Sequence, residues 1–124
     1  VNFCAKEKPK IYATINYIVA TAQAAFWLGA SPIVIHTGFY MERPASECKK
    51  LVYDTYEKCL EEMEKRKITG VVLGAELTGK KSAYGNLDEI MDLAQHFGLK
   101  KLMPVIDYAH FHAREKNLKT KVNC

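Results

Sequence analysis

The sequence predicts an α/β protein that forms part of a (β/α)8 barrel, with about three consecutive βα units and parallel strands. Helix-like and strand-like patterns alternate three times along the chain. The strand-like runs are continuously apolar instead of alternating, which is typical of parallel sheets covered on both faces. A doubly wound sheet is the alternative, but it would need a glycine-rich phosphate loop that opens a helix. Gly70 and Gly74 lie inside a strand-like run, so we favour the barrel.

The first unit consists of a helix over residues 9–28 and a strand over residues 32–35. Apolar residues recur at helical spacing, Pro9 occupies a tolerated first-turn position, and Gly29 stands where a left-handed cap belongs. The β-branched run that follows is short and apolar, as in a buried strand, and it leads into His36.

The second unit consists of a helix over residues 45–66 and a strand over residues 70–75, which ends at Glu76. The helix carries one apolar stripe, and its charged residues cover the remaining faces. A loop rich in Gly and Lys follows over residues 77–85. Loops on rigid scaffolds often carry function, so this one is of interest.

The third unit begins with Asn86 and Glu89, whose three-residue spacing is that of a capping box. The helix runs over residues 87–97 and stops at Gly98, and a strand over residues 102–106 leads to Asp107. The remaining Lys-rich tail has no apolar period, so no further element is predicted there.

Length and composition limit the classes of protein. At 124 residues the chain fits one small domain, and we treat residues 1–124 as a single partial barrel. A complete barrel takes about 250 residues, so three units are less than half of one. The net charge of +4 is too small for histone-like coating of nucleic acid, although it suits a phosphate-bearing partner. The longest mainly apolar stretch, residues 11–35, is interrupted by polar residues, Gly and Pro, so no membrane span is expected.

The N-terminus and the cysteines bear on the compartment. The first residues lack the basic start and apolar middle of a secretory signal, and the initial Val1 is consistent with a start within a longer protein. The four cysteines form no Cys-x-x-Cys unit, and Cys48 and Cys59 share one side of a helix. We interpret the cysteines as buried small apolar residues in a reducing cytosol, rather than as disulfides or metal ligands. We therefore expect a cytoplasmic protein.

Each predicted strand ends in a potential metal ligand, namely His36, Glu76 and Asp107. Strand ends in a barrel meet at one opening, and neighbouring strands lie about 4.8 Å apart, so Glu76 could bridge ions held from either side. Asp107 and His110, three residues apart, can project into the same opening. One such residue alone is often structural, but the joint pattern favours a metal site. Nitrogen and oxygen ligands without thiolate suit zinc, manganese or iron.

Four segments carry a resemblance to a known family. They are residues 33–40 (IVIHTGFY), 74–80 (GAELTGK), 85–87 (GNL) and 104–114 (PVIDYAHFHAR). In this order and spacing they resemble the central part of the endonuclease IV family, particularly its archaeal-type members. Members of that family are (β/α)8 barrels of the xylose-isomerase-like kind. They cleave DNA on the 5′ side of abasic sites with up to three metal ions, usually zinc.

The resemblance implies a role for each ligand residue. His36 would bind the first metal, Glu76 would bridge two metals, and Asp107 and His110 would bind the second and third. The family usually has proline where this chain has Thr37. The family's remaining ligands lie on strands that this sequence does not contain, and four ligands cannot fill three metal sites.

The function implied by the resemblance is metal-dependent hydrolysis of a phosphodiester in DNA that contains abasic sites, as in base-excision repair. Glu76 and Asp107 would be the catalytic residues among the metal ligands. Lys80, Lys81 and Arg114 lie near the same rim and would contact the DNA backbone, with ordinary surface charge as the alternative. Tyr84 is a weaker candidate for lining the pocket of the extruded nucleotide.

Two other interpretations stay open. One is a sugar isomerase or epimerase of the same barrel superfamily, which also places Glu, Asp and His at strand ends. The other is a truncated barrel fragment that keeps the fold without activity. Three parallel strands leave two unpaired edges, which favour association. We therefore expect either self-association or a missing remainder of the barrel.

Overall fold

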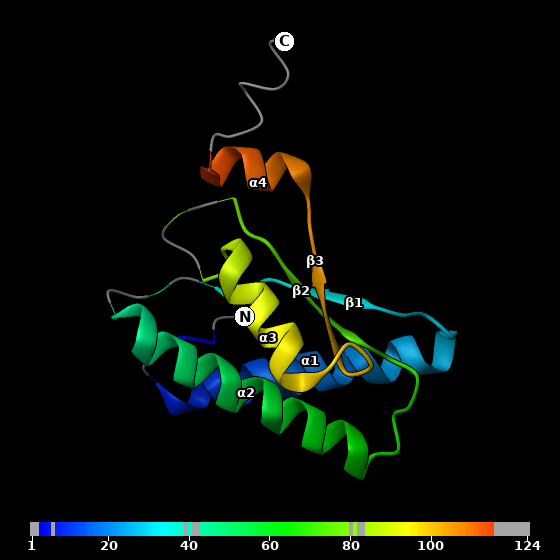
Figure 1. Cartoon of the computed structure of the whole chain (residues 1–124). Helices are drawn as coiled ribbons and strands as arrows, with labels where there is room; N and C mark the ends of the chain where they lie inside the picture. Colours follow the sequence, from blue (N-terminus) through cyan, green and yellow to red (C-terminus); the bar gives the residue numbers. More distant parts are fainter. Residues whose placement is uncertain are drawn as a thin grey trace.

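The computed structural model describes residues 3–5, 7–38, 40, 43–79, 81 and 84–115, apart from the side chains of residues 110, 111, 113 and 115. Within them, helices and strands alternate in the order α1 (Lys8–Leu28), β1 (Ile33–Ile35), α2 (Ala45–Lys65), β2 (Leu73–Glu76), α3 (Leu87–Phe97), β3 (Leu102–Val105) and α4 (Tyr108–Glu115). The strands form one parallel sheet in the order β1-β2-β3. This arrangement confirms the predicted fold class, a part of an α/β barrel (Figure 1).

Local sequence signals set the ends of the first and third helices as expected. Gly29 has φ +70°, and its N–H donates back to the carbonyls of Ala25 and Phe26, which closes α1. The Asn86 side chain accepts the N–H of Glu89, and the Glu89 carboxylate accepts the N–H of Asn86, so the predicted capping box is present. Capping of this kind satisfies N–H groups that have no partner inside the helix.

The chain departs from the sequence prediction at β2 and after β3. The second strand begins at Leu73 instead of residue 70, because Gly70 takes φ +75° and turns the chain before the strand. Residues 108–115 form α4, which the sequence did not indicate. Its first turn is stabilised by Asp107, whose Oδ1 accepts the N–H of Ala109 at 2.8 Å.

Residues that pair across the three strands form rows, and these rows differ in how deeply they are buried. Ile33, Leu73 and Leu102 stand side by side in register and are buried against the helices. Val34, one residue along β1, is 53% exposed, so burial on both faces, as predicted for this strand, is wrong at its middle residue. In β2 the same row holds Gly74, where an added Cβ would stand 2.8 Å from Val105 Cγ2. A larger residue at position 74 would therefore displace the Val105 side chain and crowd the Ile33 carbonyl oxygen of β1, 3.2 Å away.

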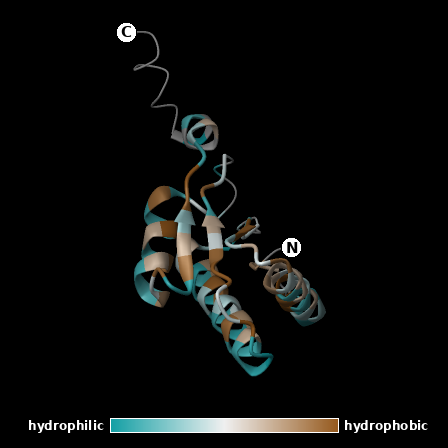
Figure 2. Cartoon of the chain, turned by 90° about the vertical axis from the view of Figure 1, so that its right-hand side faces the viewer, coloured by the Kyte–Doolittle hydropathy of each residue, from teal (hydrophilic) through white to brown (hydrophobic). Residues whose placement is uncertain are grey.

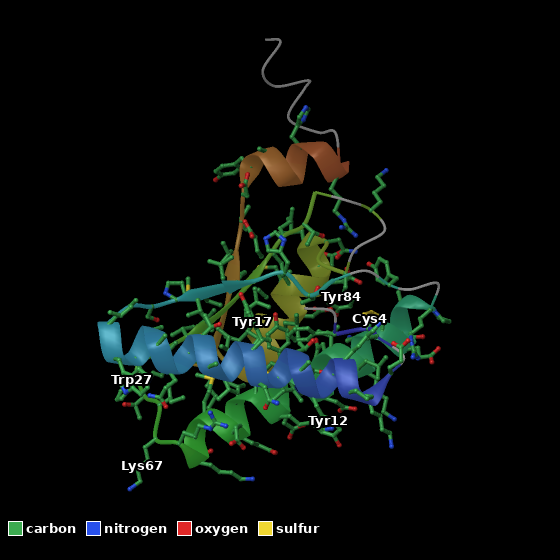
Figure 3. All side chains as sticks on the ribbon, turned by 180° about the vertical axis from the view of Figure 1, so that it is seen from behind. Cys4, Tyr12, Tyr17, Trp27, Lys67 and Tyr84 are labelled. Carbon is green, nitrogen blue, oxygen red and sulfur yellow. A yellow bond between two sulfur atoms is a disulfide. The ribbon has the colours of Figure 1, made fainter. Side chains whose placement is uncertain are left out.

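The disulfide between Cys4 and Cys48 contradicts the expectation that these cysteines are unpaired, since their Cα atoms are 5.5 Å apart. The pairing depends on tertiary packing, because Phe3 packs on Tyr56 of α2 with ring centroids 4.6 Å apart. Cys4, labelled in Figure 3, is thereby held against the start of α2. Spacing along the sequence does not show such a contact. Cys59 is a free, buried thiol as predicted, and burial raises its pKa to about 12.

None of the helices that the structure describes combines the length and the apolar character needed to cross a bilayer.

Candidate functional site

The carboxyl ends of the three strands lie at one edge of the sheet. Ile35 pairs with Ala75 and Glu76 pairs with Val105, so the residues that end β1 and β2 are neighbours. Figure 2 shows strand arrowheads that point to the same end of the molecule, where α4 lies. The strand ends therefore bring sequence-distant side chains to one place, as barrel topology requires.

His36 and Glu76 are in direct contact at this edge. The His36 Nε2 atom lies within hydrogen-bonding distance of the Glu76 Oε2 atom. The Glu76 side chain is 13% exposed and the His36 side chain is 57% exposed. The carboxylate is thus mostly withdrawn from water and oriented by a neighbouring imidazole, which itself faces solvent. An imidazole nitrogen and a carboxylate oxygen held together are donors that suit a divalent transition metal.

Asp107 and His110 follow β3 at the same end of the sheet. Asp107 is partly buried, and its Oδ1 accepts the N–H of Ala109, which fixes the carboxylate at the start of α4. His110 belongs to the first turn of α4, but its side chain is outside the described residues. Among the described side chains, no three His, Cys, Asp or Glu residues gather closely enough to hold a metal ion. The structure therefore brings together two of the four predicted ligand residues and places the backbone of the other two nearby.

The residues predicted to contact DNA differ in their exposure to solvent. Lys81 is exposed on the loop after β2, and Lys80 lies outside the described residues. Arg114 is 4% exposed, and its guanidinium donates to Thr78 Oγ1 at 2.8 Å, so this arrangement does not present it to a DNA backbone. Tyr84 is fully buried, and this excludes it as the wall of an open pocket. A local pattern of charge and aromatic residues could not reveal this burial.

The loops after β1 and β2 are joined by backbone contacts at Tyr84. The Thr37 hydroxyl donates to the Tyr84 carbonyl at 2.5 Å, and the Tyr84 N–H donates to the Gly38 carbonyl at 2.9 Å. The N–H of Phe3 donates to the Thr37 carbonyl at 2.8 Å. Thr37 is 1% exposed, and the Tyr84 carbonyl satisfies its buried hydroxyl. The residue after His36 thus has a structural role that explains why a hydroxyl side chain suits this position.

Glu89 is a second residue whose role extends beyond the sequence prediction. Its Oε1 accepts N–H groups from Gly85 at 2.9 Å and from Asn86 at 3.0 Å. Both of its carboxylate oxygens lie 2.8 Å from the Tyr40 hydroxyl, which donates to them. The pKa of Tyr40 is raised to about 12, mainly by burial and further by the hydrogen bond and the negative charge of Glu89. The capping-box spacing identified Glu89 as a cap, but nothing in the sequence indicated Tyr40 as its partner.

Comparisons with known proteins agree with the topology. Residues 1–122 match the family model described as a xylose isomerase-like TIM barrel. An uncharacterized protein of Methanocaldococcus jannaschii is 27% identical over 118 residues, which are 95% of this chain and 41% of that relative. The chain therefore spans less than half the length of this relative. No solved structure matches the chain significantly.

Proposed function

Since the chain belongs to the xylose isomerase-like TIM barrel family, we propose that it supplies the central strands of a metal-dependent hydrolase that cleaves DNA at abasic sites. The family includes AP endonucleases and isomerases, so its membership alone leaves the reaction open. The observation that carries the proposal is the contact between His36 and Glu76 at the carboxyl ends of adjacent parallel strands. Catalytic groups of barrel enzymes lie at this end.

Four residues would hold the divalent cations, with zinc as the expected metal and manganese or iron as alternatives. His36 and Glu76 already supply a nitrogen and an oxygen donor in contact. Asp107 would add a second carboxylate from the start of α4, and His110, three residues later, would add an imidazole. When bound, zinc would supply Lewis-acid activation of water and of the phosphodiester near neutral pH.

The protein's own groups would orient these ligands and the DNA. Glu76 is mostly withdrawn from water and holds the His36 imidazole by Nε2, which restricts the rotation of both side chains. The N–H of Ala109 holds one oxygen of Asp107 in place. Lys81 is exposed on the loop after β2 and, with Lys80, would contact the phosphates on either side of the lesion, an interaction that salt weakens.

The experiment that tests this proposal compares two substrates. A duplex with one abasic site and a ketose sugar are each incubated with the zinc-loaded chain. We expect nicking of the duplex, and Glu76→Gln should reduce it by about 100-fold or more, because a bridging carboxylate would become a neutral amide. Glu62→Gln, at a partly exposed carboxylate on α2, serves as the matched control and should nick normally.

Two outcomes would overturn the assignment in different ways. Isomerisation of the sugar without nicking would favour a sugar isomerase of the same superfamily. Zinc binding without turnover of either substrate would favour a barrel fragment that has no activity of its own.

A further proposal concerns the open side of the sheet. Residues 11–28 of α1 contain no charged side chain. Tyr17 on α1, labelled in Figure 3, is 65% exposed, and Val34 on β1 is 53% exposed. A cavity of about 250 Å³ lies between α1 and β1, with Tyr17, Val34 and His36 among its lining residues. We propose that this surface is covered in the working protein, by the remainder of a barrel or by a second copy of the chain. If light scattering shows that the 124-residue chain is a fully folded monomer, this surface does not need to be covered, and the proposal is contradicted.

A further inference from the structure

A polar network connects the loops that follow β1 and β2 with helices α3 and α4. We propose that Arg114 is a positioning residue, which links Thr78 and Tyr40 to α4 and thereby fixes the three strand ends that carry the candidate ligands. This inference rests on the proposed function, since it assigns a role toward the same site. Arg114 is not one of the candidate ligands, and its burial argues against the surface role that its charge suggested.

The contact between Arg114 and Thr78 joins α4 to the loop after β2. The Arg114 Nη1 donates to Thr78 Oγ1 at 2.8 Å and lies 3.5 Å from the Thr78 carbonyl oxygen. Its Nη2 lies 3.5 Å from the Lys81 carbonyl oxygen. Thr78 is itself 6% exposed and follows Glu76 by two residues. One guanidinium therefore reaches both sides of the loop that leaves the Glu76 strand.

The contact with Tyr40 extends the network to the loop after β1. Arg114 also interacts electrostatically with Tyr40, because its positive charge counteracts the rise in the pKa of Tyr40 that burial and Glu89 cause. The Tyr40 hydroxyl also donates to Glu89, whose Oε1 accepts the N–H of Gly85. Tyr40 follows His36 by four residues. The network thus runs from α4 through Tyr40 to α3 and back to the loop after β2.

Burial and shape explain why an arginine occupies this position. A buried cation is costly unless its donors are satisfied, and here carbonyl and hydroxyl oxygens surround the guanidinium, with the Glu89 carboxylate one residue further along the network. The planar guanidinium can donate in several fixed directions, whereas a lysine ammonium acts as a single point. The network needs several directions, because Thr78, Lys81 and Tyr40 come from different parts of two loops.

The test measures the loops directly and then the metal site. The variants are Arg114→Gln, Arg114→Lys and the milder Tyr40→Phe. Arg66→Gln is the matched control, since it removes a partly exposed guanidinium that pairs with Glu62 at the carboxyl end of α2. Amide hydrogen exchange of the metal-free full chain reports on the loops. Calorimetric zinc titration and the absorption spectrum of bound cobalt report on the ligands.

We expect exchange at the amides of Thr78, Tyr84 and Gly85 to speed up about tenfold in Arg114→Gln, while exchange in α1 and α2 stays unchanged. Zinc affinity should fall about 10- to 100-fold, as for other residues that orient ligands, and the cobalt spectrum should change. Arg114→Lys should show most of this loss, and Tyr40→Phe a smaller change in the same direction. Arg66→Gln should match the wild type in all three measurements.

Three results would overturn the inference. These are unchanged loop exchange in Arg114→Gln, faster exchange spread evenly over the chain, or loosened loops with unaltered zinc affinity and cobalt spectrum. If the wild type binds no zinc, the proposed metal site fails, and the exchange data still decide whether Arg114 fixes the loops. If Arg114→Gln does not fold, Tyr40→Phe and Arg114→Lys carry the test.

Discussion

The two ends of the sheet are held in different ways. At the carboxyl ends, the side chains of Thr37, Glu89 and Arg114 hydrogen-bond to the loop that follows β2, and an added Cβ at Gly85 in that loop would stand 3.0 Å from Thr78 Oγ1. At the amino ends, the turns at Gly29, Gly70 and Gly98 have positive φ, and an added Cβ there would meet nothing within 4 Å. Figure 1 shows α4 beyond the carboxyl end of β3. Gly85 at the carboxyl ends thus requires both a backbone conformation and open space, whereas the glycines at the amino ends require only the backbone conformation.

The largest expected effect is at the disulfide that fastens the N-terminal segment near the carboxyl end of β1. Cys4 and Cys48 are 44 residues apart, and opening a loop of that size should lower the free energy of unfolding by about 4 kcal/mol. Urea unfolding of Cys4→Ser, with and without a thiol reductant, measures this difference. Cys59→Ala is the control, since Cys59 is free. A wild type whose stability is insensitive to reductant would show that the disulfide does not support this end.

The next effect should come from Gly85→Ala, which tests whether the carboxyl-end loops are as tightly packed as the structure indicates. Gly85 has φ +140°, and the new Cβ would stand 3.2 Å from the Glu76 carbonyl oxygen as well as close to Thr78. Strained backbone and crowding together should lower the free energy of unfolding by about 2–3 kcal/mol. Zinc affinity should fall too, because the displaced carbonyl belongs to a candidate ligand. Thermal unfolding and zinc titration provide the two measurements, and an unchanged melting temperature would contradict the tight packing.

A smaller effect is expected for Glu89→Gln, which keeps the size of the side chain and removes its charge. The amide oxygen of Gln can still accept hydrogen bonds from Tyr40 and Gly85, but these bonds are weaker because the acceptor is no longer charged. The expected cost is about 1.5 kcal/mol of unfolding free energy. The variant should also lower the pKa of Tyr40, because the negative charge that raises it is gone. The titration of Tyr40 is obtained as the difference in tyrosine absorbance between each protein and its Tyr40→Phe variant. An unchanged pKa of Tyr40 in Glu89→Gln would show that Glu89 does not interact with Tyr40.

The same pKa shift sets a direction for alkaline stability. The pKa of Tyr40 in the folded chain is raised to about 12 from its ordinary value of 10.0, so the neutral phenol is favoured in the folded state. Its contribution to stability is present below pH 10 and is lost as the pH rises toward 12. Tyr40→Phe should reduce the slope of stability against pH in that interval. Urea midpoints measured across the interval provide the test, and an equal slope in both proteins would contradict it.

The smallest expected effect is at the amino ends of the strands. Gly70→Ala places a methyl group in open space, so only the positive φ of +75° opposes it, at a cost of about 1 kcal/mol. Zinc affinity should not change, because the residue lies at the opposite end of β2 from Glu76. Thermal unfolding measured beside Gly85→Ala compares the two ends with one type of substitution. Equal losses of stability in Gly70→Ala and Gly85→Ala would contradict the proposed difference between the two ends of the sheet.

The same contrast explains how much the sequence could predict. Helix ends depend on local signals, so the cap at Gly29 and the capping box of Asn86 and Glu89 were predictable. The contact between His36 and Glu76 followed from placing two apolar runs as adjacent parallel strands. Burial of Arg114 was not predictable in this way, because it depends on contacts between α4 and the loop after β2, which are distant in the sequence.

The cysteine pairing and α4 show the same limit. Cys4 meets Cys48 because Phe3 packs on Tyr56, a tertiary contact between distant segments that spacing along the chain does not reveal. The helix after β3 has a weak sequence pattern, but Asp107 caps its first turn and Arg114 anchors its last turn to Thr78. Contacts between loops therefore decide what local pattern leaves open at the carboxyl ends.

Anomalous diffraction at the zinc absorption edge, from crystals of the full chain grown with zinc, tests the central claim most directly. We predict a zinc ion within about 2.0–2.2 Å of the His36 imidazole and of a Glu76 carboxylate oxygen. Asp107 or His110 should complete its coordination. Zinc bound elsewhere on the chain, or no zinc at these strand ends, would contradict the proposed metal site.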